Sequence, residues 1–418
     1  MKYSFKYGKG EKELIIPERM DVSLLKPINP EIVKDPVTKL KQSLSNPINI
    51  KPLKNCHQPK KIAIAIPDES RPFPIKLLLP ALLEYFYKTW PQLKPEQIII
   101  VIGGGLHPPP DKTGIERIIP QELIPGCQVI SHDAVNSPIV DYGVTSRGTP
   151  VQINAAYAQA DFKVIMGQID AHQFVGYTGG AKGVVIGCAS EKMIEHNHGL
   201  MFHKKAQVGH YKDNPVRQDL NEAGAKIRID LVINIVLNAE KQIITLLTGE
   251  PIAVLQEGLK TCAAVYGVEI AQKYDIVLAS CGGYPKDICL YQAQKGLNLA
   301  SQALKPKGKI LLLAECAQGV GDDVYYDYVT KFKNAEEAMK DFTTNKFRMG
   351  AHKSFLFSRT LTNFEVVLTS DYSSEILNKC HIPVGDAQGT INQWCETDRK
   401  LRVAIIPNAN TTYFITED

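Results

Sequence analysis

The segment KIAIAIP, residues 61–67, is a short run of apolar and β-branched residues with almost no polar position. A strand with one solvated face alternates apolar and polar residues, whereas a parallel strand buried on both faces is continuously apolar. Further runs of this kind are QIIIVIG at 97–103, FKVIMG at 162–167 and LVINIVL at 231–237. These segments predict an α/β fold with a mostly parallel sheet covered by helices.

A second series of apolar runs follows in the C-terminal third, and segments of helical composition, 290–304 and 334–342, lie between them. The 418 residues also exceed the ~100–200 residues of one domain. We therefore expect two α/β lobes, an N-terminal domain of residues 1–270 and a C-terminal domain of residues 271–418, with the active site in the cleft between them. The second series is DIVLASCGG at 275–283, KILLLAE at 309–315, FEVVLTS at 364–370 and LRVAIIP at 401–407.

Composition excludes several classes of protein. A net charge of +4, with basic and acidic residues interspersed, provides no basic stripe for nucleic acid. No apolar run approaches the ~18 residues of a membrane span, and the first residues lack the apolar core of an export signal. Nine cysteines without a C-x-x-C pair fit a reducing compartment. We expect a soluble cytoplasmic enzyme without a nucleic-acid or membrane partner.

Polar residues follow the first two strands, where ligands of open α/β sheets bind. In DESRPFP, Arg71 could hold a carboxylate or phosphate bidentately, or it could simply pair with Asp68 in solvent. In GGGLHPPP, His107 stands between three glycines and three prolines, which would fix an imidazole suited to acid–base catalysis near neutral pH. The alternative is a surface histidine in a turn.

The segment DAHQFVGYTGGAKGVVIG, residues 170–187, is the most distinctive. Asp170 and His172 come directly after a predicted strand, and glycines then form a loop that carries Lys182. Glycines expose backbone N–H groups and the lysine supplies charge, which is typical of an anion cradle. A Walker A loop is excluded, because Ala181 precedes the lysine where that motif has glycine. A glycine-rich turn with a solvated lysine is the alternative.

Two further motifs carry candidate residues. In EHNHG, His196 and His198 would face the same side on a strand but not on a helix, so one histidine ligand is as plausible as a pair. Imidazole suits zinc, copper, iron and nickel, and surface or core histidines are the alternative. In GGYPKDICLYQAQKG, a helix would place Tyr291 and Lys295 on one face, where Lys295 could be a second anion anchor or part of a solvated surface.

Five ordered motifs, PDESRPFP, GGGLHPP, DAHQFVGYTGGAKGVVIG, EHNHG and GGYPKDICLYQAQKG, resemble the lactate racemase family of nickel-dependent α-hydroxyacid racemases and epimerases. The likeness spans nearly the whole chain. It implies a nickel-pincer nucleotide, a pyridinium-3-thioamide-5-thiocarboxylic acid mononucleotide that holds nickel through sulfur and carbon, and proteins that synthesise it as partners. By resemblance, Lys182 would be the thioamide tether of this cofactor, His198 would be a nickel ligand, and Asp68, Gly179 and Gly180 would also bind the cofactor. The acid–base pair would be His107 and His172. The substrate carboxylate would be held by Arg71 and Lys295, and Tyr291 and Gln292 would also contact the substrate.

The expected chemistry agrees with this resemblance. The α-hydrogen of a hydroxycarboxylate is weakly acidic, so hydride removal is an easier route than proton removal. A base would take the hydroxyl proton while hydride moves to an electrophilic cofactor, which gives a planar keto acid reducible from either side. We expect a racemase or epimerase of small 2-hydroxy acids, with lactate as the default substrate.

Two other functions stay open on the sequence. One is a metal-dependent hydrolase with His196 and His198 as ligands and Asp170 or His172 as base. The other is a non-catalytic nucleotide-binding protein in which GYTGGAKG only holds a phosphate.

Overall fold

The computed structural model describes residues 1–28, 30–123, 126–344, 347–348 and 350–416. The chain folds into two compact units. One unit, Asn29–Val265, is called the central unit because it is central in the sequence. The other, the terminal unit, consists of Met1–Ile28 and Tyr266–Asp418.

The central unit is built on a six-stranded sheet with the order β13-β12-β9-β4-β5-β6. All neighbouring strands are parallel except β12 and β13. The four runs predicted as strands are confirmed as β4, β5, β9 and β12, each buried along its middle. The strands are β4 (Ile62–Pro67), β5 (Ile98–Gly103), β6 (Gln128–Ser131), β9 (Phe162–Gln168), β12 (Leu231–Leu237) and β13 (Ile243–Gly249).

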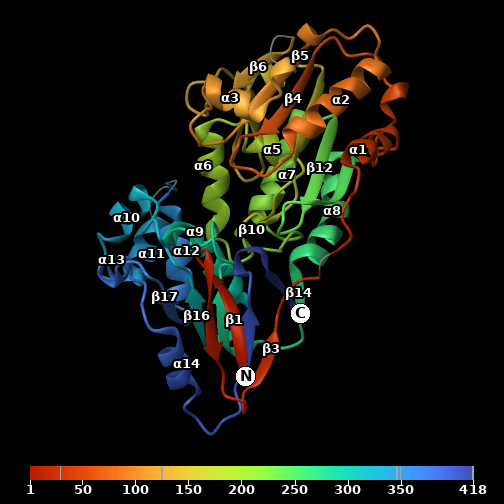
Figure 1. Cartoon of the computed structure of the whole chain (residues 1–418). Helices are drawn as coiled ribbons and strands as arrows, with labels where there is room; N and C mark the ends of the chain where they lie inside the picture. The colour runs from red at the N-terminus through yellow and green to blue at the C-terminus, as the bar shows by residue number, and fades with distance from the viewer. Residues whose placement is uncertain (29, 124–125, 345–346, 349, 417–418) are drawn as a thin grey trace. The chain divides into compact units, whose positions relative to one another are not determined.

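Helices cover both faces of this sheet, which explains its continuous apolar strands. α1 (Pro36–Ser45) and α2 (Ile75–Thr89) pack on the face that carries Ile64 and Ile100, and Figure 1 shows both helices beside the strands. α5 (Lys182–Val185) packs on the opposite face against β4 and β9. There a Cβ on Gly183 would lie 2.7 Å from Ile165, so the short helix depends on this glycine to approach the sheet.

Shorter elements of the central unit connect these layers. The helices α6 and α7 pack on each other, and α7 also packs on α5. Two hairpins lie nearby, β7 with β8 and the two-residue strands β10 with β11. The bounds are α3 (Lys112–Ile118), β7 (Ile139–Val144), β8 (Pro150–Asn154), α4 (Ala155–Ala158), β10 (Ala171–His172), β11 (Gly176–Tyr177), α6 (Glu191–Gly199), α7 (Pro215–Ile227) and α8 (Pro251–Tyr266).

The terminal unit has a five-stranded, fully parallel sheet with the order β17-β16-β15-β18-β3. The four runs predicted as strands are confirmed as β15–β18, and the predicted helices as α9 and α11. The elements are β3 (Asp21–Leu24), α9 (Leu290–Ala300), β15 (Tyr274–Ser280), β16 (Leu304–Leu313), β17 (Glu365–Thr369), β18 (Arg402–Ile406), α10 (Asp323–Val329), α11 (Ala335–Thr344), α12 (His352–Leu361) and α13 (Ser374–Lys379).

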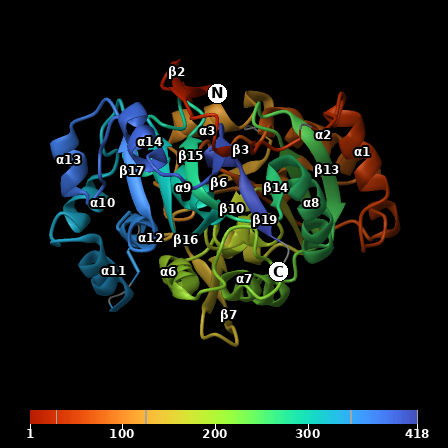
Figure 2. The same ribbon diagram turned by 90° about the horizontal axis from the view of Figure 1, so that it is seen from below.

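The two faces of the terminal sheet are covered differently. α9, α10, α12 and α13 bury one face, and Figure 2 shows α10 to α13 gathered beside β17. The other face is covered by α14 (Ala387–Cys395) and by the hairpin of β1 (Lys2–Tyr7) and β2 (Gly10–Ile15). A small parallel pair, β14 (Gly267–Ile270) with β19 (Tyr413–Thr416), completes the unit.

The first 28 residues differ from the expected domain division, which placed them with the N-terminal domain of residues 1–270. They belong to the terminal unit, because β3 hydrogen-bonds along β18 and the hairpin buries Phe5 and Ile16 against the same sheet. These short amphipathic strands lack the long apolar runs on which the prediction relied. The second boundary, between Val265 and Tyr266, lies close to the expected one.

Two global features concern thiols and membranes. All nine cysteines are free thiols, and eight of them are buried. Within the described ranges, every helix is too short or too polar to cross a membrane.

Candidate active site

The candidate residues of the central unit follow neighbouring parallel strands. β4 lies between β5 and β9, and Pro67 at the end of β4 pairs with Gly103 at the end of β5. Asp68 therefore lies at the same edge of the sheet as the glycine loop that leads to His107. The segment that contains His172 follows β9 and begins at this edge too. The carboxyl ends of parallel strands are where open α/β sheets bind ligands.

Asp68 and His107 form a hydrogen-bonded pair at this edge. Nδ1 of His107 lies 2.7 Å from Oδ2 of the buried Asp68, and the Ser70 hydroxyl donates to Oδ1 at 2.6 Å. Burial favours a raised pKa for Asp68, but these hydrogen bonds and the charges of His107 and Arg71 outweigh it, so the pKa is lowered. The carboxylate is ionised at neutral pH and orients an imidazole whose side chain is 46% exposed.

Arg71 lies near the anionic Asp68 and the basic Lys182. Its side chain is exposed, and its charge lowers the pKa of Asp68 and that of Lys182. Among the residues that the structure describes, Arg71 makes no ion pair, so its guanidinium can bind an anion. The structure thus places His107 beside Asp68, and Arg71 near enough to Asp68 and Lys182 for its charge to act on both.

The glycine loop before Lys182 is held in a conformation that only glycine tolerates well. Gly179 and Gly180 have φ of 90° and 59°, and the Gly180 N–H donates to Oδ1 of buried Asn234 at 2.8 Å. A Cβ on Gly179 would lie 2.5 Å from Cγ1 of Ile169. The loop is thus a fixed cradle rather than a flexible turn.

Arg217 stabilises this glycine loop through hydrogen bonds to its backbone. It is fully buried on α7, and its guanidinium donates to the carbonyls of Tyr177 and, at 3.3 Å, Gly179. Burial lowers its pKa to about 10, so it stays cationic at neutral pH. α7 begins at Pro215 because the Asn214 side chain accepts hydrogen bonds from the N–H groups of Val216 and Arg217, and because proline is favoured at the first helical position.

Lys182 begins α5 directly after the cradle and is partly buried. Burial lowers its pKa to about 7, and the charges of Arg71 and Arg217 act in the same direction. A much larger fraction of the Lys182 amine is therefore neutral at pH 7 than in an ordinary lysine, which is almost fully protonated. A neutral amine is a nucleophile.

An aromatic ring links His172 to His198. The Phe174 ring packs edge-on against both imidazoles, with centroids 4.7 Å from His172 and 5.0 Å from His198. The Phe174 carbonyl accepts a 2.8 Å hydrogen bond from Asn214, which fixes the segment to α7. The structure thus brings these two predicted residues together around one buried side chain.

A buried network orients His198. Asn197 donates through Nδ2 to Asp219 at 2.8 Å, so its Oδ1 faces Nδ1 of His198, at 3.3 Å, as an acceptor. Asp219 is itself buried and accepts from Thr145 and Thr149. The amide oxygen is an acceptor, so this contact favours a proton on Nδ1 of His198.

His196 and His198 do not form a metal pair. They lie on α6, where residues two apart point in different directions, and Nε2 of His196 lies 3.0 Å from the Arg147 carbonyl. Across the described ranges, no group of three or more His, Cys, Asp and Glu side chains is arranged to hold a metal ion.

Tyr291, Gln292 and Lys295 lie on α9 of the terminal unit, as the helical spacing predicted. Tyr291 and Lys295 are partly buried and Gln292 is exposed. A second lysine, Lys353 of α12, lies 4.9 Å from the centre of the Tyr291 ring.

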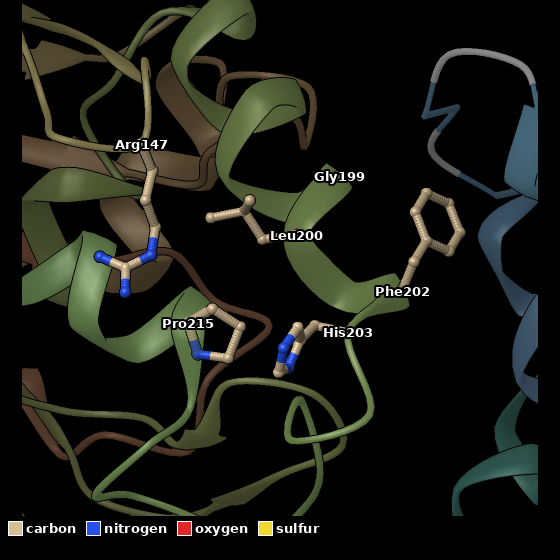
Figure 3. A pocket seen from close by; sticks show the side chains of 6 residues that line it. All are labelled: Arg147, Gly199, Leu200, Phe202, His203 and Pro215. Atoms are coloured by element: carbon tan, nitrogen blue, oxygen red, sulfur yellow. The ribbon is translucent and has the colours of Figure 1, made fainter.

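A cavity of about 700 Å³ lies at the C-terminal end of α6. Figure 3 shows Arg147 on one side and His203 on the other, with Leu200 and Pro215 between them. None of the predicted site residues lines it, although Gly199 follows His198. The cavity therefore adds no residue to the candidate site.

Several residues of the site were missed by sequence reasoning. Arg217, Asn234 and the pair Asn197–Asp219 act through other residues, and the periodicity of their helices and strands does not distinguish them from other positions. Only the dipeptide Asn-Pro before α7, a helix start, could have indicated that Arg217 enters a helix.

Comparison with known proteins identifies the same family that the motifs resemble. Two family models match, the lactate racemase N-terminal domain over residues 7–209 and the lactate racemase C-terminal domain over residues 269–411. Lactate racemase of Thermoanaerobacterium thermosaccharolyticum is 29% identical over 339 residues, 79% of each chain. Lactate racemase of Lactiplantibacillus plantarum is 26% identical over 383 residues, 88% of each chain.

Solved structures agree. The lactate racemase apoprotein of T. thermosaccharolyticum superposes with a TM-score of 0.89 over all of both chains, at 25% identity. A Thermotoga maritima protein shares the fold at 15% identity, with a TM-score of 0.62 over 91% of this chain and 98% of its own. With both domain models matched, the chain belongs to the lactate racemase family of isomerases.

Proposed function

We propose that this enzyme racemises or epimerises a small 2-hydroxy acid, with lactate as the default substrate. The observation that carries the proposal is the contrasting hydrogen bonding of two histidines. In the neutral ring, His107 donates through Nδ1 to the Asp68 carboxylate, and Nε2 is then the basic nitrogen. Nδ1 of His172 faces the Val175 N–H at 3.4 Å, which favours a proton on Nε2.

This pairing fits a reaction that must run in both directions. His107 accepts the hydroxyl proton of one enantiomer at Nε2, and His172 returns a proton to the oxygen of the other. In the reverse direction the two histidines exchange roles. Arg71 and Lys295 hold the substrate carboxylate, because a guanidinium and an ammonium together fix its orientation while the α-carbon inverts.

The chain's residues also fit the nickel-pincer nucleotide. Lys182 supplies a partly neutral amine for a thioamide tether, and its cradle would clash with any side chain on Gly179. His198 would bind nickel through Nε2, because its Nδ1 faces the amide oxygen of Asn197. When bound, the nucleotide supplies a hydride acceptor. Asp68 also orients His107 through its carboxylate.

The proposal extends to partners and location. A nucleotide of this kind has to be made by dedicated synthesis proteins, which we propose as partners of the chain. Nine free thiols support a reducing, cytoplasmic setting.

The test is a racemisation assay of protein prepared with the cofactor-synthesis proteins, over D- and L-2-hydroxy acids labelled with deuterium at C2. Hydride transfer predicts racemised product that keeps its label in water, whereas proton abstraction would exchange it for hydrogen. Mass spectrometry should also find the nucleotide on Lys182. Racemisation with complete loss of label contradicts the mechanism, and absence of racemisation across the panel contradicts the function.

The single variants His107→Asn and His172→Asn separate the enzyme from a nucleotide-binding protein. Both should lose about 10²–10⁴-fold in turnover while keeping the Lys182 adduct, since each removes one acid–base group. A protein that only binds a nucleotide would have no turnover to lose.

A further inference from the structure

The cavity at the C-terminal end of α6 has a hydrogen-bond donor on each of two sides and apolar side chains between them. Its volume of about 700 Å³ lies in the range of ~300–1,000 Å³ that is typical of ligand pockets. Arg147 stands on one side and His203 on the other, with Leu200 and Pro215 between them (Figure 3). All of its lining residues belong to the central unit, and none of the predicted site residues is among them.

Arg147 is held in place before any ligand binds. It lies in the turn between β7 and β8, and buried Asp219 of α7 accepts hydrogen bonds from the hydroxyl groups of Thr145 and Thr149 on either side of it. The guanidinium itself donates through Nη2 to Oε1 of Gln218, also on α7. Such preorganisation reduces the entropy that a ligand loses the protein on binding.

The charge of Arg147 is not taken up by an ion pair. In the part of the chain that the structure describes, no carboxylate pairs with Arg147, and only its Nη2 has a hydrogen-bond acceptor. Hydrogen bonds from Ser146 lower the pKa of Glu222, and the Arg147 charge contributes to that shift, but both Glu222 oxygens accept from Ser146. The remaining N–H groups of the guanidinium can therefore bind a carboxylate bidentately.

His203 provides a donor on the opposite side of the cavity. It is exposed and follows the short turn Leu200–Phe202. Its Nδ1 accepts the N–H of Lys205 at 3.1 Å, so the neutral ring carries its proton on Nε2. This N–H can donate to an anionic oxygen.

The segment that begins with His203 is positively charged. Residues 203–212, HKKAQVGHYK, contain three lysines and no acidic residue. Lys205 pairs with Asp213 at 3.1 Å, whereas Lys204 and Lys212 are exposed. The potential of this segment favours an anion over a neutral or cationic ligand.

We propose that the cavity binds an aliphatic dicarboxylate, with one carboxylate on the Arg147 guanidinium and the other on Nε2 of His203. The methylene chain lies against Leu200 and Pro215. A monocarboxylate would leave one donor without a partner, and inorganic phosphate would gain nothing from the apolar middle. The site is separate from that of the racemised substrate and does not rest on the proposed function.

The first experiment is isothermal titration calorimetry of the full-length apoprotein with succinate, glutarate and adipate. The best of the three should bind about tenfold or more tightly than hexanoate and inorganic phosphate, because each of these lacks one set of contacts. Binding of hexanoate or phosphate as tightly as the best dicarboxylate would overturn the assignment. Absence of dicarboxylate binding would overturn the site.

Variants then locate the bound ligand. Arg147→Met should weaken dicarboxylate binding about tenfold to a hundredfold, and His203→Ala about tenfold, because each removes a charge-assisted hydrogen bond. Lys192→Met, which changes an exposed lysine in the first turn of α6, is the matched control and should bind as wild type does. Arg71→Met should also keep its affinity. If Arg71→Met loses binding and Arg147→Met does not, the ligand occupies the substrate site and the proposal is wrong.

A second measurement on the wild-type protein decides the matter if the Arg147 variant does not fold. Diethyl pyrocarbonate acylates exposed imidazoles, and peptide mass spectrometry follows the reaction at His203 with and without the dicarboxylate. The bound ligand should slow acylation of His203 several-fold while His57, another exposed histidine, reacts at an unchanged rate. Equal rates at His203 in the presence and absence of a saturating dicarboxylate would overturn the proposal.

Discussion

Nδ1 of His107 lies 2.7 Å from Oδ2 of Asp68 in the candidate site. An ionised carboxylate can only accept, so the contact fixes the tautomer of the imidazole as well as its direction. His107 itself is largely exposed, and the buried carboxylate is what holds it.

Asp68→Asn should therefore lower kcat by about 10²-fold or more with a smaller effect on KM, because an amide can hold the wrong tautomer of His107. Initial rates with both lactate enantiomers measure this. Ser70→Ala is the matched control, since it removes a hydrogen bond to the same carboxylate without touching the imidazole. Equal losses in the two variants would show that the carboxylate does not act through His107.

Gly179→Ala should prevent stable loading of the cofactor, because the added Cβ meets Ile169 and the residue keeps a φ of 90°. Gly143→Ala is an unusually close control. Gly143 has a φ of 82°, but a Cβ there meets nothing within 4 Å. Both variants carry the backbone strain, so a difference in Lys182 adduct between them isolates the shape of the cradle. Equal amounts of the Lys182 adduct in the two variants would contradict the conclusion that the glycine loop has a fixed conformation.

Attachment of the cofactor to Lys182 should accelerate about tenfold per pH unit below 7 and level off above it, because only the neutral amine reacts. Intact-protein mass spectrometry over time measures the rate. The same lowered pKa makes the unfolded chain bind more protons between pH 7 and about 10.5, so apoprotein stability should rise with pH over that window. Thermal melts of Lys182→Met should show a weaker rise.

Arg217→Met should move the midpoint of that attachment profile to higher pH, because the Arg217 charge contributes to lowering the Lys182 pKa. It should also destabilise the fold by about 1–3 kcal/mol for each carbonyl left unpaired, those of Tyr177 and Gly179. Chemical denaturation gives the second quantity. An unchanged midpoint in a folded variant would show that Arg217 supports the loop without tuning the lysine.

Asn197→Ala should weaken nickel binding by the loaded protein about 10–100-fold, since the proton on Nδ1 of His198 loses its acceptor. Retained nickel after dialysis, measured by mass spectrometry of the metal, provides a readout separate from activity. His196→Ala should retain nickel as wild type does, because that ring faces the Arg147 carbonyl. Loss in both variants alike would point to general damage of α6.

The strands and the residues at their ends could be predicted from sequence for one physical reason. A strand buried on both faces has to be apolar throughout, and the first polar or glycine residue after it marks the sheet edge, as with Asp68 after β4. His107, His172 and Lys182 follow from the same rule. The family resemblance added roles to these residues.

The supporting residues could not be predicted, because their function depends on contacts between distant segments. Asn234 lies inside the apolar run of β12 and meets a loop more than fifty residues away, and Arg217 looks like a surface position of an amphipathic helix. The place of β3 was missed for a similar reason. Its four residues, DVSL, carry no periodicity that would select β18 as a neighbour.

The pairing of β3 with β18 has a consequence for the order in which the chain assembles. Residues 21–24 are made before the central unit, whereas the strand that they join, Arg402–Ile406, is made after it. At synthesis rates of about 5–20 residues per second, β3 waits on the order of tens of seconds for its neighbour. The central unit is contiguous and can fold meanwhile. The glycine loop before Lys182 can therefore be complete before the parallel sheet of the terminal unit has formed.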